Sequence, residues 1–206
     1  MANVFEFVAE ARSAAGSSAA KVVRRQGKVP AVIYGGSEAP EMLTLDHNEL
    51  LKHLAHESVY SHVLDINVAG RAEKAVLKHI QRHPSKPVIL HVDFMRVTKG
   101  HALKVRVPFH FVNEESSVGV KKGGIVMHSM SDVEVSCIPS KLPEFIEIDM
   151  ANIDLGAALH LSDVVLPEGV EIPELQLGHE HDQSVVQIIM PRAAESSDDA
   201  EEVTEE

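Results

Sequence analysis

Short runs of β-forming residues that stop at glycine or proline dominate the first hundred residues, and this pattern constrains the fold most. In NVFEFVAEAR, the side chains of Phe5, Phe7 and Ala9 recur with the period of two that is typical of a strand. The run VPAVIY is short, β-branched and followed by two glycines, which predicts a buried strand. Further runs of this kind lie at residues 41–45, 60–68, 73–82 and 88–97.

Two helices are expected among these strands. The first would have Ser18 as its N-cap and Gly27 just beyond its end, and the second would follow Asp46, an N-cap with Glu49 three residues later. About six strands with short connections favour a small β-barrel or a strongly twisted sheet over a parallel α/β fold. We therefore expect a mainly β chain with a few short helices, whose N-terminal domain is a small barrel at residues 1–97.

The remaining chain predicts a second, mostly β domain at residues 98–191. Its strand-like runs are separated by turns that contain proline or glycine, and residues 158–167 are expected to hold one helical turn. Residues 192–206 combine small and acidic residues that cannot bury a core, which predicts a disordered acidic tail. The strand-like runs lie at 103–112, 124–129, 132–138, 145–150, 170–172 and 184–190.

Charge is distributed unevenly between the two halves of the chain. Residues 1–100 contain 13 Lys and Arg against 10 Asp and Glu, whereas residues 101–206 contain 6 against 21. This asymmetry places any polyanionic partner on the first half. The acidic second half also fits a surface that only maintains solubility, and both interpretations stay open.

The sequence also indicates the cellular compartment in which the protein is found. No apolar run approaches the ~20 residues that are needed to cross a bilayer, and the N-terminus lacks the pattern of a signal peptide. Cys137 is the single cysteine and cannot form an internal disulfide, which fits a reducing compartment. The sequence therefore predicts a cytoplasmic protein with no membrane partner.

Two groups of polar residues in the first half point to RNA binding. Four cations are spaced i, i+3, i+4 and i+7, which would place them on one helix face, the last of them at or just past the end of the helix, and let them neutralise phosphates. His91 and Asp93 lie two residues apart in a strand whose even positions, Val88 to Phe94, are apolar, so both would point away from the core and could read base edges. Both patterns equally fit solvated faces of a helix and a strand. The four cations are Lys21, Arg24, Arg25 and Lys28.

Motifs of catalysis and metal binding do not stand out. The chain has no phosphate-binding glycine loop followed by Lys-Ser or Lys-Thr, and no GxSxG elbow. Cys137 alternates with Val133 and Val135, which predicts a buried structural thiol. Two histidine-containing segments suit solvated surfaces better than metal sites. We therefore expect no enzyme, no cofactor and no metal. The histidine-containing segments are 47–56 and 179–182.

The segments KVVRRQGKVPAVIYGG, LDHNEL, QRHPSKP and HVDFMRV resemble the bacterial large-subunit ribosomal protein twenty-five family, which includes the general stress protein Ctc. The resemblance is dense over residues 1–97 and looser over 98–191, as in the long form with an added C-terminal β domain. It implies a structural protein that binds an irregular internal loop of 5S rRNA in the central protuberance of the large subunit, as a monomer on the ribosome. A stress-induced accessory or assembly factor that uses the same RNA-binding domain is the alternative.

The resemblance also implies which residues contact RNA. Arg12, Lys21 and Arg24 match basic positions expected on phosphates, whereas Arg25 and Lys28 are added from charge and helical spacing alone. Residues 17–22 depart from the corresponding segment of more basic family members, which implies fewer phosphate contacts. The C-terminal domain is expected to contact neighbouring ribosomal proteins or to project outward. Three strands are further implied to face the RNA, through Tyr34, Lys78, His91 and Asp93.

Overall fold

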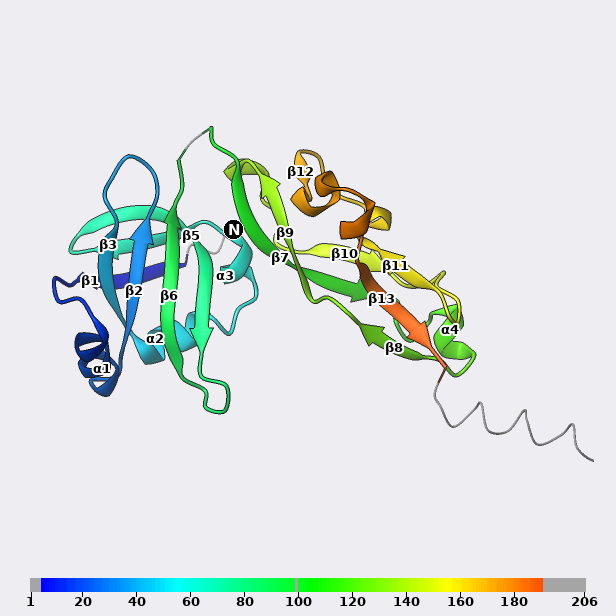
Figure 1. Cartoon of the computed structure of the whole chain (residues 1–206), viewed down its shortest axis with the longest axis horizontal. Coiled ribbons are helices and arrows are strands. Elements are labelled where there is room, and N and C mark those ends of the chain that lie inside the picture. The colour runs from blue at the N-terminus through cyan, green and yellow to red at the C-terminus, as the bar shows by residue number, and fades with distance from the viewer. Residues whose placement is uncertain (1–4, 99, 191–206) are drawn as a thin grey trace, which may run out of the picture. The chain divides into compact units, whose positions relative to one another are not determined.

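The computed structural model describes residues 5–98 and 100–190 (Figure 1). Packing divides these residues into two units. The barrel unit holds the residues up to 108 together with 134–144 and 168–171, and the second unit holds the rest. The division at residue 97 stays a prediction, and the predicted acidic tail at 192–206 lies outside the described residues.

Six strands of the barrel unit form a closed barrel in the order β1-β3-β2-β6-β5-β4, which confirms the predicted fold (Figure 1). The ring is closed by parallel pairing of β1 with β4, in which Phe7 lies opposite Ile66. Closure leaves no exposed strand edge around the barrel. The six strands are β1 (Glu6–Ala11), β2 (Lys28–Tyr34), β3 (Glu41–Asp46), β4 (Leu64–Val68), β5 (Arg71–Arg82) and β6 (Ile89–Arg96).

Alternate residues of these strands fill the barrel interior, as their period of two predicted. Phe7 and Ala9 are buried, and Ile33, Leu43 and Phe94 are completely inaccessible. Each fully buried Leu, Ile or Phe contributes roughly 1.5–3 kcal/mol relative to an exposed one. The interior is therefore a packed apolar core, and polar side chains of the same strands are left on the outer surface.

Three short helices accompany the barrel: α1 (Ser17–Arg25), α2 (His47–His53) and α3 (Ser58–Ser61). Asp46 caps α2 as predicted, because its Oδ1 accepts hydrogen bonds from the main-chain N–H groups of Asn48 and Glu49 at 2.8 and 3.1 Å. The prediction that Ser18 caps α1 is wrong. The N-cap is Gly16, whose φ of 96° is a left-handed conformation that glycine adopts without strain.

Two irregularities in the pairing of β5 with β6 change which side chains face outward. The register shifts between Leu77 and His79, and again between Gln81 and Arg82. At the second shift Gln81 pairs with His91 and Arg82 pairs with Ile89, so Leu90 has no counterpart. The predicted alternation therefore fails at the start of β6, where Ile89 is buried. Val88 is 36% exposed.

The strands after residue 102 form two sheets, with the orders β10-β7-β9-β12 and β11-β13-β8. The predicted strands are all present, and the predicted helical turn is a 3₁₀ turn at Leu161–Asp163. The structure adds α4 (Val118–Lys121) and β11 (Ala158–His160), and none of the described helices is long and apolar enough to cross a membrane. The other strands are β7 (Leu103–Val112), β8 (Ile125–His128), β9 (Asp132–Cys137), β10 (Ile146–Asp149), β12 (Val170–Glu171) and β13 (Ser184–Ile189).

Candidate nucleic-acid interface

The outer surface of β2, β5 and β6 presents a group of polar side chains that we name the polar barrel face. Pairing in β5 and β6 sets Gln81 opposite His91 and His79 opposite Asp93, so each pair shares one face. In the neighbouring strand β2, Val32 lies opposite Asp93, and the outward Tyr34 lies two residues further along, opposite Met95. The polar barrel face consists of Tyr34, His79, Gln81, His91 and Asp93.

His91 and Asp93 contact each other directly, as their spacing in the strand suggested. His91 Nδ1 lies 2.6 Å from Asp93 Oδ1, and the side chains are 25% and 28% exposed. This contact fixes the orientation of the imidazole ring. It leaves Nε2 of the imidazole and the second carboxylate oxygen available for a base edge.

Tyr34 is placed beside this pair. Partial burial raises the pKa of the Tyr34 hydroxyl, and the nearby carboxylate of Asp93 raises it further. The phenol therefore stays protonated at neutral pH and is a hydrogen-bond donor or acceptor. Tyr34, His91 and Asp93, three residues that the sequence singled out, thus lie together on two neighbouring strands.

Arg24 connects α1 to the same region of the barrel. Its Nε and Nη2 donate hydrogen bonds to the main-chain oxygen of Leu90, at 2.9 and 2.8 Å. Leu90 is the extra residue of the bulge in β6, so Arg24 satisfies a carbonyl beside the irregular pairing. Arg24 therefore holds α1 against the strand segment that precedes His91.

The four cations of the predicted helix face are not equivalent. Lys21 and Arg25 are exposed on α1 and have no ion-pair partner among the described residues. Lys28 is not helical but is the first residue of β2, and its ammonium pairs with the carboxylate of Glu10 in β1. Two cations thus project freely from α1, while Arg24 and Lys28 bind other parts of the barrel unit.

Arg12 follows the last residue of β1. Its Nη1 donates to the main-chain oxygen of Ala14 at 3.0 Å, while its buried Nε has no hydrogen-bond partner among the described residues. An unpaired buried donor is costly, and an anion within reach would remove that cost. The arrangement is compatible with the phosphate contact that the resemblance implies.

Lys78 is placed differently from the other predicted site residues. It is the extra residue of the first bulge in β5, and its ammonium donates to Lys104 O at 3.0 Å and to Glu134 Oε1 at 2.7 Å. The hydrogen bond from Lys78 lowers the pKa of the Glu134 carboxyl, although partial burial opposes this effect. Lys78 is therefore already neutralised within the barrel unit, unlike Lys21 and Arg25.

His79 and Gln81 are members of the polar barrel face that sequence reasoning missed. Val76 faces out of the barrel, where it packs with Leu103 and Val105, so strict alternation would put Lys78, not His79, on the outward side of β5. The bulge at Lys78 changes the phase of the strand, so the exposed residues opposite Asp93 and His91 are His79 and Gln81. The polar residues of this segment were visible in the sequence. Which of them face outward depended on the pairing of β5 with β6.

The histidines near α2 have structural roles. His47 Nε2 accepts a hydrogen bond from the main-chain N–H of Ile89 at 3.2 Å, and the ring of His53 lies 4.6 Å from that of Phe7. The interpretation of these histidines as purely solvated side chains is therefore wrong for His47 and His53. The described residues contain no group of three or more His, Cys, Asp or Glu that could hold a metal ion.

Cys137 is 4% exposed on the same side of β9 as Val133 and Val135, and burial raises the pKa of its thiol. The thiol is therefore protonated at neutral pH and a poor nucleophile. The prediction of a buried structural cysteine is confirmed.

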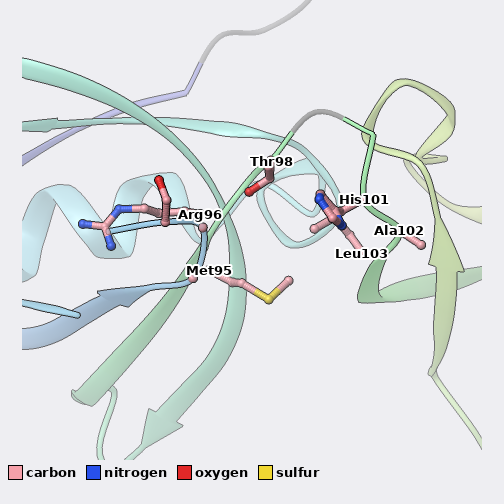
Figure 2. Close-up of a pocket in the computed structure, with 9 residues that line it drawn as sticks. Met95, Arg96, Thr98, His101, Ala102 and Leu103 are labelled. Atoms are coloured by element: carbon pink, nitrogen blue, oxygen red, sulfur yellow. The ribbon is translucent and has the colours of Figure 1, made fainter. Parts of the chain in front are cut away.

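A cavity of about 500 Å³ lies beyond the end of β6 (Figure 2). Figure 2 shows the guanidinium of Arg96 turned away from Thr98 and His101, and its Nε donates to Glu73 at 2.7 Å. The remaining lining is mostly apolar or small, so no charged groups converge inside. The lining residues are Gly35, Gly36, Ser37, Met95, Arg96, Thr98, His101, Ala102 and Leu103.

Comparison with known families separates the chain into two matched parts. Residues 7–94 match the model of the Ribosomal L25p family, and residues 102–192 match the model of the C-terminal domain of ribosomal protein TL5. The first match contains the whole polar barrel face and α1. Both models describe ribosomal proteins.

Individual relatives cover almost the full chain. "Large ribosomal subunit protein bL25" of Methylococcus capsulatus is 52% identical over 96% of this chain and 98% of the relative. The protein of the same name from Cellvibrio japonicus is 49% identical over 98% of this chain and 100% of the relative. The chain belongs to the Ribosomal L25p family, in its long form with the second domain. This family is structural and not enzymatic, as the sequence predicted.

Proposed function

We propose that this protein is a structural component of the large ribosomal subunit that binds 5S rRNA through the polar barrel face and the cations of α1. The relatives at about half identity are named as large ribosomal subunit proteins, and they match almost the full length of the chain. The corresponding location is the ribosome in the cytoplasm, with one copy of the chain on each subunit.

The observation that carries the proposal is the contact between His91 and Asp93 beside Tyr34. These side chains offer donors and acceptors on a rigid strand platform, and a carboxylate accepts from the exocyclic amines of cytosine or guanine. Duplex RNA has a wide, shallow minor groove, and an irregular internal loop exposes further base edges. A convex strand face suits such a surface better than a long helix does.

The cations of α1 supply affinity rather than sequence information. Lys21 and Arg25 are exposed and free to neutralise phosphates, which is the main source of affinity for RNA. Arg24 fixes the position of this helix relative to β6 through Leu90 O. In this arrangement phosphate contacts set the register in which His91 and Asp93 meet the bases.

The second unit is acidic, in contrast to the cationic helix α1. Its described residues include Lys121 and Lys122 as the only Lys or Arg, against ten Asp and Glu. Such a surface repels RNA phosphates, so we propose that it contacts neighbouring ribosomal proteins instead.

Binding of the full chain to a 5S rRNA fragment tests the proposal. One fragment carries the irregular internal loop, and a matched fragment replaces this loop with a regular Watson–Crick helix. We expect tighter binding to the first fragment and a linear fall of log affinity with log salt for both. Equal affinity for the two fragments, or binding that is independent of salt, would contradict the proposal. Cofractionation with large subunits during normal growth distinguishes a resident subunit protein from a stress-induced factor.

A further inference from the structure

The sheet formed by β11, β13 and β8 covers the core of the second unit with one of its faces. Val186 and Ile188 of β13 are completely buried there, and Val126 of β8 packs against the same cluster. Side chains alternate along a strand, so the residues between these positions point away from the core. In β8 these residues are Ile125 and Met127.

The opposite face of the same sheet carries three exposed apolar side chains. Ile125, Met127 and Ile189 are 54%, 48% and 41% exposed. Pairing makes them neighbours, because Ile125 lies opposite Ile189, and Gln187 lies between Met127 on one side and Ala158 on the other. We name these five residues the open β8–β13 face. A contiguous group of exposed apolar side chains on two adjacent strands, β8 and β13, marks an interaction surface.

The edge of this sheet adds a second feature. Among the described residues β8 is one of the two edge strands of this sheet and pairs with β13 alone. An edge strand presents unpaired main-chain N–H and C=O groups, which a partner strand can satisfy. The apolar face and the free edge therefore lie on the same element.

The charge of the second unit restricts what the partner can be. The described residues of this unit contain ten carboxylates and two lysines, Lys121 and Lys122, and Lys122 already binds Asp154 at 2.7 Å. An RNA or an anionic membrane would be repelled by this surface, whereas a protein rich in lysine and arginine would be attracted and oriented by it. The complementary partner is a basic protein with apolar side chains at the centre of its contact surface.

We infer that the open β8–β13 face docks a basic protein of the large ribosomal subunit, with Ile125, Met127 and Ile189 at the centre of the contact. The inference rests on the proposed function for its location on the ribosome, and it adds the surface and the chemistry of the partner. Apolar side chains at the centre supply binding energy, and the net negative charge of the second unit steers the approach.

Photo-crosslinking from a defined position tests this directly. The full chain carries a benzophenone amino acid at Met127 and is incorporated into large subunits, which are then irradiated. A matched chain carries the same group at Leu177, which is 70% exposed but outside the open β8–β13 face. We expect a crosslink from position 127 to one protein of basic composition, at a yield about tenfold above that from position 177. A crosslink to rRNA, or equal yields from both positions, would overturn the inference.

A second variant separates this inference from the proposed function. Ile125→Glu, made in the chain with the benzophenone group at position 127, should reduce the crosslink about tenfold and leave binding to the 5S rRNA fragment unchanged. An unchanged crosslink would refute the inference while the proposed function stands. Absence of the parent chain from large subunits, together with loss of binding to 5S rRNA, would refute both.

Discussion

Arg24 of α1 donates two hydrogen bonds, at 2.9 and 2.8 Å, to the main-chain oxygen of Leu90 in β6. The two residues are 66 positions apart in the chain. Their contact joins the helix that carries the free cations Lys21 and Arg25 to the strand that carries His91 and Asp93. It therefore sets the distance between the groups proposed to bind phosphates and the groups proposed to contact bases.

Arg24→Ala should destabilise the protein, because it leaves the carbonyl of the half-buried Leu90 without two charged donors. We expect a loss of about 1–3 kcal/mol in the free energy of unfolding, measured by urea denaturation. Arg25→Ala is the matched control, since Arg25 is exposed and should change stability by less than about 0.5 kcal/mol. Similar losses for the two variants would show that the contact with Leu90 does not stabilise the fold.

The Arg25→Ala variant also separates a contribution to RNA affinity from a contribution to RNA specificity. Arg25→Ala should weaken binding to the irregular and the regular RNA fragments by the same factor, and lower the log–log salt slope by about 0.9 if the value for B-DNA applies. Affinities measured at several salt concentrations give both quantities. A change in the ratio of the two affinities would show that Arg25 contacts bases.

His91→Ala and Asp93→Ala should have the opposite effect. Each removes a group of the polar barrel face, so discrimination between the irregular loop and a regular helix should fall by about 1–3 kcal/mol for each lost base contact. Competition binding with the two fragments measures this difference. Parallel losses on both fragments would refute a role in base recognition.

Glu134 provides a prediction on pH. The hydrogen bond from Lys78 holds the pKa of its carboxyl below the ordinary value of 4.5, so the folded state favours the ionised form. This contribution is complete above pH 4.5 and is lost as the pH falls through the lowered pKa. We expect the stability difference between the wild type and Glu134→Gln to shrink on acidification from pH 6 to pH 3. A difference that does not vary with pH would contradict the assigned contact.

Gly124 tests the packing of the second unit. A Cβ at this position would lie 2.4 Å from Ile188 Cγ2 and 2.8 Å from Gly119 O, so no side chain fits. Gly124→Ala should cost about 1–3 kcal/mol through overpacking, measured by urea denaturation. In an Ile188→Ala background the cost should be smaller, because the first clash is gone. Equal costs in both backgrounds would place the strain elsewhere.

Local patterns of the sequence were sufficient for the elements and for most of the core. The alternation of Phe5, Phe7 and Ala9 predicted the inward face of β1, and Asp46 predicted the start of α2. These features depend on neighbours in the chain, since strand period and helix capping are local. The proximity of His91 and Asp93 was predictable for the same reason.

Long-range pairing decided what local patterns could not. The bulges at Lys78 and Leu90 exist only because β5 and β6 pair with different numbers of residues, and the first bulge brings His79 to the outward face opposite Asp93. The helical spacing of the cations correctly grouped Lys21 with Arg25. It did not reveal that Arg24 binds Leu90 or that Lys28 pairs with Glu10.

The sequence by itself thus determined the β-rich class, the positions of the strands, and the pair of side chains on β6. The tertiary structure alone decided the closure of the barrel through β1 and β4, the phase of β5, and the attachment of α1 to β6. The physical reason is that side-chain direction within one strand follows from the chain geometry. Contacts between strands far apart in sequence follow from which hydrogen bonds and apolar surfaces the whole fold can satisfy together.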